Sequence, residues 1–145
     1  MRKGFRGIFF GIAALMAACS LQPDMVVMSD VDNSDWSDMA TVKYLNNELD
    51  ECDMSIVLHV NPRFKQKHLT LEITMLTPDS LRLTEQVRFD VEHSPQRKTL
   101  AATDVEIPYR RNLKLKHKGQ YVWQITPSHS IEGVESAGIK FQANN

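Results

Sequence analysis

The alternating stretch Leu69-Thr70-Leu71-Glu72-Ile73-Thr74-Met75 decides the fold class. Its odd-numbered residues are apolar and its even-numbered residues are polar, a period of two that fits a half-buried β-strand, because successive side chains of a strand point to opposite faces. An amphipathic helix would instead repeat its apolar residues every three or four positions. The stretch therefore predicts a strand with one face on a hydrophobic core.

The same alternation recurs over much of the chain. The segment Met54–Val60 places Met54, Ile56, Leu58 and Val60 on one face. Further alternating runs cover residues 81–91, 105–109, 113–115, 120–126 and 138–142. Residues 41–50 fit either a short helix or a strand, and we interpret them as a strand because Asn46-Asn47 resembles the end of a hairpin.

Two residues mark where this pattern is interrupted. Glu85 is a polar residue in an apolar series, which predicts a bulge or a sheet edge. Pro108 cannot donate a backbone hydrogen bond, so its run is expected at an edge strand or a break. Seven or eight short strands separated by turn residues, with no convincing helix, predict an all-β domain: a single antiparallel β-sandwich or jelly roll.

The N-terminus has the three parts of a secretory signal. Arg2, Lys3 and Arg6 provide positive charge, and the uncharged, mostly apolar run Gly7–Ala18 follows. That run is shorter than the roughly 20 apolar residues that a membrane-spanning helix needs. We therefore expect a signal peptide over residues 1–18, a lipidated N-terminus and tether over residues 19–35, and a β-sandwich domain over residues 36–145.

Cys19 is the predicted site of lipidation. The sequence Leu15-Met16-Ala17-Ala18-Cys19 resembles the lipobox of bacterial lipoproteins, in which the cysteine thiol receives the diacylglyceryl group. The palmitate-type acyl chains of a mature lipoprotein would hold the domain on a membrane. Ser20 follows the cysteine in place of Asp, which favours the outer membrane, and we expect the periplasmic leaflet.

The charge balance argues against nucleic acid as a partner. Three of the 17 basic residues lie in the leader, so the mature chain has 14 basic against 18 acidic side chains. A general nucleic-acid binder would carry a basic footprint. The membrane and envelope proteins are the partners that the sequence predicts.

Cys52 is then the single thiol of the mature chain, in Asp50-Glu51-Cys52-Asp53. One thiol cannot form an internal disulfide. The surrounding carboxylates should raise its pKa, which predicts an unreactive cysteine.

The sequence predicts no metal or catalytic site and no cofactor besides the lipid on Cys19. Asp30, Asp32, Asp35 and Asp38 resemble calcium ligands in type, but their spacing lacks the glycine and the closing glutamate of an EF-hand loop, which favours a solvated acidic linker. The histidines have no metal-ligand spacing; they are His59, His68, His93, His117 and His129. His129 lies in a turn-rich segment and is the most plausible exposed polar site. We expect no enzymatic activity.

A basic row is the candidate partner-docking surface. If one strand continued from residue 110 to 118, Arg110, Lys114, Lys116 and Lys118 would share a face, with Leu113 and Leu115 on the other. Such a row could contact lipid phosphates or an acidic protein. It could equally be a solvated edge on which lysines prevent strand-to-strand aggregation.

The C-terminal third resembles a known family. Gly119-Gln120-Tyr121-Val122-Trp123-Gln124-Ile125 and the segment Ile131–Phe141 are similar to the C-terminal strands of the gliding-motility lipoprotein family GldH. Trp36 and the strands over residues 55–60 and 69–76 follow the order of that family. Two positions depart from the family pattern. Ala137 stands where a larger aliphatic residue is common, and Asn61-Pro62-Arg63-Phe64 matches the family's Arg-Asn-x-x-x-Tyr-x-Tyr segment only loosely.

This resemblance implies a non-enzymatic accessory or scaffold lipoprotein of the gliding or type IX secretion machinery. The matching residues look structural and carry no active site; they are Gly119, Tyr121, Trp123, Gly133, Gly138 and Ile139. The alternative is a small ligand-binding module, for example one that binds a glycan. A glycan binder should expose Trp36 or Trp123, whereas a scaffold should bury Trp123.

Overall fold

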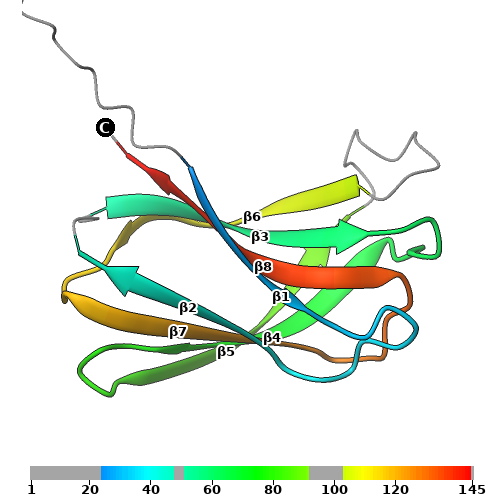
Figure 1. Ribbon diagram of the computed structural model, residues 1–145, viewed down its shortest axis with the longest axis horizontal. Helices are drawn as coiled ribbons and strands as arrows, with labels where there is room; N and C mark the ends of the chain where they lie inside the picture. The colour runs from blue at the N-terminus through cyan, green and yellow to red at the C-terminus, as the bar shows by residue number, and fades with distance from the viewer. Residues whose placement is uncertain (1–23, 48–50, 92–102, 145) are drawn as a thin grey trace, which may run out of the picture.

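The computed structural model describes residues 24–47, 51–91 and 103–144. Within them the chain forms eight strands: β1 (Met25–Asp30), β2 (Ala40–Asn46), β3 (Glu51–Val60), β4 (His68–Leu76), β5 (Arg82–Asp90), β6 (Thr103–Lys114), β7 (Gly119–Pro127) and β8 (Val134–Ala143). They build two four-stranded antiparallel sheets, with the orders β1-β8-β3-β6 and β2-β7-β4-β5 (Figure 1). The predicted β-sandwich is confirmed.

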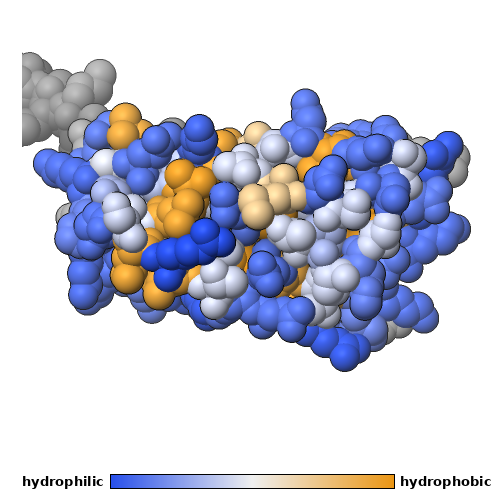
Figure 2. Space-filling view, turned by 90° about the horizontal axis from the view of Figure 1, so that it is seen from below, coloured by the Kyte–Doolittle hydropathy of each residue, from blue (hydrophilic) through white to orange (hydrophobic). Residues whose placement is uncertain are grey.

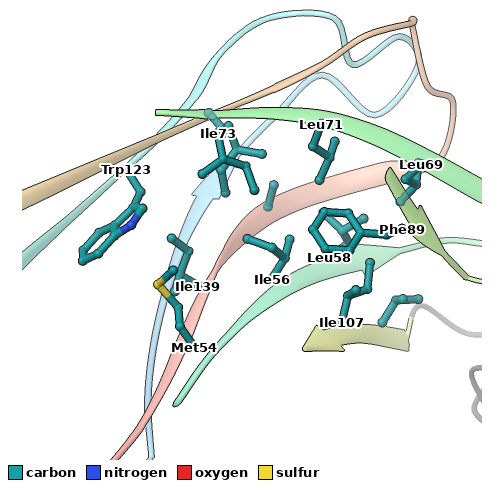
Figure 3. Close-up of a cluster of buried hydrophobic side chains, with 14 of the residues drawn as sticks. Met54, Ile56, Leu58, Leu69, Leu71, Ile73, Phe89, Ile107, Trp123 and Ile139 are labelled. Carbon is teal, nitrogen blue, oxygen red and sulfur yellow. The ribbon is translucent and has the colours of Figure 1, made fainter. Parts of the chain in front are cut away.

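The core lies between the two sheets and follows the alternation of the sequence. Ile56 and Leu58 of β3 are fully buried, and Leu71 and Ile73 of β4 point toward them from the opposite sheet (Figure 3). Each fully buried aliphatic side chain stabilises the fold by roughly 1.5–3 kcal/mol relative to exposure. The polar residues of these strands lie on the outer faces.

Strand β7 is an interior strand of its sheet, and one of its faces lies on the core, as the alternation predicts. It pairs with β2 on one side and with β4 on the other. Tyr121, Trp123 and Ile125 are 2, 1 and 0 % exposed, so they lie on the core face. The rings of Tyr121 and Trp123 stack at 5.7 Å between centroids, and Phe141 of β8 lies 5.1 Å from Trp123.

Residues 40–46 form a strand, in agreement with the interpretation of that ambiguous segment. Pro108 lies in β6, which is an edge strand, and Glu85 lies in β5, which is also an edge strand. Both interruptions of the alternation therefore mark sheet edges.

The prediction of a tether over residues 19–35 is wrong for residues 25–30. Residues 25–30, which fall in the stretch assigned to a tether over residues 19–35, form β1 and pair with β8, with Met25 opposite Phe141 and Asp30 opposite Ser136. Backbone pairing with β8 places this segment at the edge of the sheet, and Val27 packs against the core although no side chain of β1 is fully buried. The domain therefore begins before Trp36.

The predicted single strand from residue 110 to residue 118 is also wrong. β6 ends at Lys114, and its pairing with β3 shifts register twice, around Met54 and Cys52. Asn112 has a φ of 53°, which breaks the regular alternation. Lys116 and Lys118 therefore lie in the connection to β7 rather than on the strand.

Among the described residues no helix is long and apolar enough to cross a membrane.

Candidate functional site

A pocket of about 350 Å³ opens between β5 and β6, which are edge strands of the two sheets on the same side of the sandwich. Its walls are mostly apolar, with a few polar groups. The lining residues are Met54, Ile73, Met75, Leu83, Thr84, Glu85, Tyr109, Arg110, Leu113 and Trp123. Its volume falls in the range of about 300–1,000 Å³ that is typical of small-molecule sites.

Strand register brings the polar group of β5 into this pocket. Glu85 pairs with Ile73 of β4 and therefore faces the same side as that buried residue. A carboxylate facing the space between two sheets needs partners, because burying an unpaired charge is costly. The side chain is 38 % exposed, so it lies at the mouth rather than in the core.

A bulge in β6 supplies those partners. The pairing with β3 runs from Pro108 opposite Ser55 to Arg110 opposite Met54, so Tyr109 is an extra residue in the ladder. The Tyr109 hydroxyl and the Arg110 guanidinium both donate hydrogen bonds to Oε1 of Glu85. These contacts join the edge strands of the two sheets.

Tyr109 remains a hydrogen-bond donor at this mouth. Burial raises the pKa of its hydroxyl well above the ordinary value, and the neighbouring Glu85 carboxylate raises it further. The Arg110 guanidinium carbon lies 4.8 Å from the centre of the Tyr109 ring, a cation–π contact. Because Glu85 and Arg110 neutralise each other, the mouth presents hydrogen-bonding groups without net charge.

Trp123 closes the inner end of the pocket. It lines the pocket, yet the residue is only 1 % exposed. Trp36 is 0 % exposed, and its indole Nε1 donates to the backbone oxygen of Asp38 at 2.8 Å. Neither tryptophan offers a flat ring to solvent, which is the result expected of a scaffold and not of a glycan-stacking platform.

The residues of the predicted docking row are divided. Arg110 belongs to the pocket mouth, whereas Lys114, Lys116 and Lys118 are exposed and lie beyond the bulge. They do not form one straight row, although Leu113 and Leu115 do turn inward. Whether these lysines dock a partner stays a prediction. Cys19 lies outside the described residues.

Cys52 is buried and its thiol is free. Burial is the main cause that raises its pKa to about 11, and the charges of Asp53 and Glu51 raise it further. The predicted direction is confirmed, with desolvation added to the carboxylate effect that the sequence indicates.

The remaining polar clusters are ion pairs on the outer face of a sheet and hydrogen bonds within a turn. His59 contacts Asp104 through Nδ1 at 2.7 Å and Glu135 through Nε2 at 3.5 Å, on the outer face of its sheet. In the acidic segment, Asp32 accepts hydrogen bonds from the backbone and the hydroxyl of Ser34. In the part of the chain that the structure describes, no group of three or more His, Cys, Asp or Glu side chains could hold a metal ion.

The sequence singles out Glu85 as out of place but does not connect it with Tyr109 and Arg110. Its interruption of the alternation was the available signal. The pairing of β5 with β4 and the bulge in β6 decide which residues meet at the mouth, and neither can be read from residue spacing.

The fold and this pocket define a β-sandwich protein with an apolar site at one open side. No protein-family model matches the sequence, and comparison with curated proteins finds no significant match. Among solved structures, a carbohydrate-binding module specific for non-crystalline cellulose is similar, with 10 % identity, a TM-score of 0.40, and coverage of 74 % of this chain and 67 % of that one.

Two further structures are similar. A structure of promiscuous carbohydrate-binding modules of the β-sandwich superfamily has 12 % identity and a TM-score of 0.35, over 83 % of this chain and 52 % of that one. A 4-O-methyl-α-glucuronidase has 12 % identity and a TM-score of 0.38, over 86 % of this chain but only 17 % of the enzyme. At these identities the likeness concerns the sandwich fold alone.

Proposed function

We propose that this protein is a cell-envelope lipoprotein, anchored through Cys19, whose β-sandwich is a non-enzymatic module that binds a hydrophobic ligand in the pocket between β5 and β6. The pocket carries this proposal, because it combines apolar walls with a few convergent polar groups. The signal-peptide pattern and the lipobox support the anchor.

The lining favours an uncharged, largely apolar ligand. Met75, Leu83 and Leu113 offer aliphatic or thioether surface, and binding a ligand there is favoured because water is excluded from that surface. Glu85 and Arg110 compensate each other's charges, so the mouth has no unpaired charge that would attract a charged ligand. A glycan would need an exposed aromatic ring, which neither tryptophan provides.

A second candidate is an accessory role like that implied by the resemblance to the GldH lipoproteins, at the periplasmic leaflet of the outer membrane. One observation favours it: residues of the resembling segments, such as Trp123 and Gly138, are buried or closely packed and so have structural roles. Both candidates describe an anchored, non-enzymatic envelope protein, and a scaffold of this kind would work through its surfaces.

The anchor is tested by labelling cells with a palmitate analogue. The wild-type protein should incorporate the label, and Cys19→Ser should lose it completely, because the thiol is the acyl acceptor. Equal labelling of both proteins would refute lipidation at Cys19. Cys52→Ser is the matched control and should keep the label, since Cys52 is buried.

The pocket is tested through the fluorescence of Trp123. In a Trp36→Phe background Trp123 is the single tryptophan of the mature chain, and it lines the pocket. A brominated alkyl chain that enters the pocket should quench its emission by heavy-atom contact. Soluble oligosaccharides form the second arm of the titration and should leave the emission unchanged.

A matched pair of variants shows whether the quenching occurs in the pocket. Leu83→Gln removes an apolar wall at a residue that is 49 % exposed and should weaken quenching several-fold. Leu45→Gln makes the same change at a residue that is 61 % exposed and outside the pocket lining, and should leave quenching unchanged. Equal affinity in all three proteins, or a response to oligosaccharides alone, would refute the hydrophobic site.

A further inference from the structure

One end of the sandwich gathers most of the exposed large apolar side chains of the described residues. β1, β3, β5 and β7 begin there, and β2, β4, β6 and β8 end there, at the left of Figure 1. Five of the six such side chains lie at this end: Met25, Val26, Leu45, Leu81 and Leu83, which are 43, 49, 61, 51 and 49 % exposed. We call it the anchor-proximal end.

Contacts between the strands confirm that these side chains share one end. The rings of Tyr44, next to Leu45, and Phe141, which pairs with Met25, stack at 4.6 Å. The β4–β5 turn, which precedes Leu81, reaches Gly119 at the start of β7. On the outer face of the β2-β7-β4-β5 sheet, apolar surface also concentrates toward this side (Figure 2).

The same end carries exposed lysines. Lys114 ends β6, and Lys116 and Lys118 lie in the connection to β7. Within the described residues no ion pair occupies these three, whereas the nearby Asp79 contacts His117 at 3.5 Å. Asp53 also lies at this end, and it accepts hydrogen bonds from the Asn112 backbone and the Asn144 amide.

The length of chain between the anchor and β1 limits how far this end can be from a membrane. Five residue steps separate Cys19 from Asp24, which span at most about 18 Å when fully extended. The opposite end of the sandwich is farther away by the length of a strand, roughly 30 Å for the ten residues of β3. A lipid on Cys19 would therefore keep the anchor-proximal end next to the bilayer.

We infer that the anchor-proximal end docks on an anionic phospholipid surface, an inference that rests on the proposed lipid anchor. The apolar side chains enter the headgroup region, and the three lysines contact lipid phosphates, the combination that holds peripheral proteins at membrane interfaces. Leu83 belongs both to this end and to the pocket lining, so docking places the pocket mouth beside the bilayer.

The orientation is tested with the mature acylated protein in vesicles of phosphatidylethanolamine and phosphatidylglycerol that contain nitroxide-labelled lipid. Single cysteines at Leu81→Cys and, at the opposite end, His129→Cys carry an environment-sensitive fluorophore, while the buried Cys52 stays unlabelled. The Leu81→Cys probe should be strongly quenched and the His129→Cys probe should not. Equal quenching of the two probes, or none at Leu81→Cys, would overturn the docking.

The charge contribution is tested by co-sedimentation of the mature, unacylated Cys19→Ser protein with the same vesicles. Lys116→Glu combined with Lys118→Glu should lower binding by roughly tenfold or more, because each lysine near an anionic surface contributes to attraction. Arg63→Glu combined with Lys65→Glu, in the exposed β3–β4 loop, changes the net charge equally and should leave binding within about twofold. Equal effects of the two double variants would refute lipid binding by Lys116 and Lys118 and would favour a protein partner for these lysines.

Failure of the proposed anchor can be recognised separately. Mass spectrometry of the purified protein shows whether Cys19 carries acyl chains, and their absence would refute the anchor. The unacylated protein still reports whether the anchor-proximal end has affinity for the lipid surface. Pocket occupancy is measured by Trp123 quenching without vesicles, so it too is independent.

Discussion

Replacing Trp123 with Ala tests the core face of β7 and the pocket together. The residue is 1 % exposed and packs against the rings of Tyr121 and Phe141. An aromatic side chain of this kind buries about 150–250 Å², which at about 25 cal/mol per Å² corresponds to roughly 4–6 kcal/mol. Measured losses for Trp→Ala in cores are about 3–5 kcal/mol.

Because Trp123 lines the pocket, we expect the loss in the free energy of unfolding to lie in the lower part of that range. Trp123 lines an existing opening, so its removal enlarges a space that water can enter and does not leave a sealed cavity. We therefore expect a loss of about 3–4 kcal/mol in the free energy of unfolding, a large share of a typical 5–15 kcal/mol.

Urea denaturation followed by far-UV circular dichroism measures this loss. Val122→Ala is the control, because its half-buried side chain lies on the other face of β7 and should cost clearly less. A Trp123→Ala midpoint equal to that of the wild type would contradict the buried position and support an exposed, ligand-stacking ring.

Three further changes test other parts of the structure. Gly138→Ala should destabilise the pairing of β1 with β8 by about 1–3 kcal/mol, because the new Cβ would lie 2.1 Å from the backbone oxygen of Val27. Amide exchange in β1 should therefore increase, and unchanged exchange there would contradict this packing. Cys52 should resist iodoacetamide at pH 8 in the folded protein and react on unfolding, because at a pKa of about 11 only about one thiol in a thousand is ionised. As this pKa lies above the ordinary 9.0, the thiol contributes stability below pH 9 that is lost as the pH rises toward 11. Asn112→Gly should be tolerated and Asn112→Val should destabilise the β6 bulge by about 1 kcal/mol or more in thermal unfolding, because φ is 53° there.

The sequence predicts the fold class because the buried faces follow strict alternation. In β4, Leu69, Leu71 and Ile73 are at most 2 % exposed. A shift of one residue would turn all three toward solvent, so the register is strongly specified by the hydrophobic pattern. The same argument applies to Tyr121 and Trp123 in β7.

The same criterion fails for β1. Its segment Met25–Asp30 has no fully buried side chain, so hydrophobic periodicity carries little information about it. Backbone hydrogen bonds to β8 hold it in the sheet, and any non-proline residue can make such bonds. Pairing of this kind depends on the neighbouring strand, which a single sequence does not identify.

The pocket was beyond sequence reasoning for a related reason. Glu85 and Arg110 are 25 positions apart and meet because β5 and β6 are the edge strands on the same side of the two sheets. A regular β6 would also point Tyr109 and Arg110 to opposite faces, whereas the bulge lets both reach Glu85. Sheet order and a bulge, rather than residue spacing, create the site.

The glycines of the segments that resemble the GldH family have structural roles. A Cβ on Gly133, which has a φ of 89°, would lie 2.3 Å from the backbone nitrogen of Phe64. On Gly138 it would meet the side chain of Met28 at 2.6 Å. Both glycines are therefore required where two segments of the chain approach closely. Such residues preserve the packing of the sandwich and say nothing about a ligand. Function must therefore be sought at the mouth of the pocket and at the anchor-proximal end, where exposed side chains such as Leu83 and Lys116 can vary with little effect on the core.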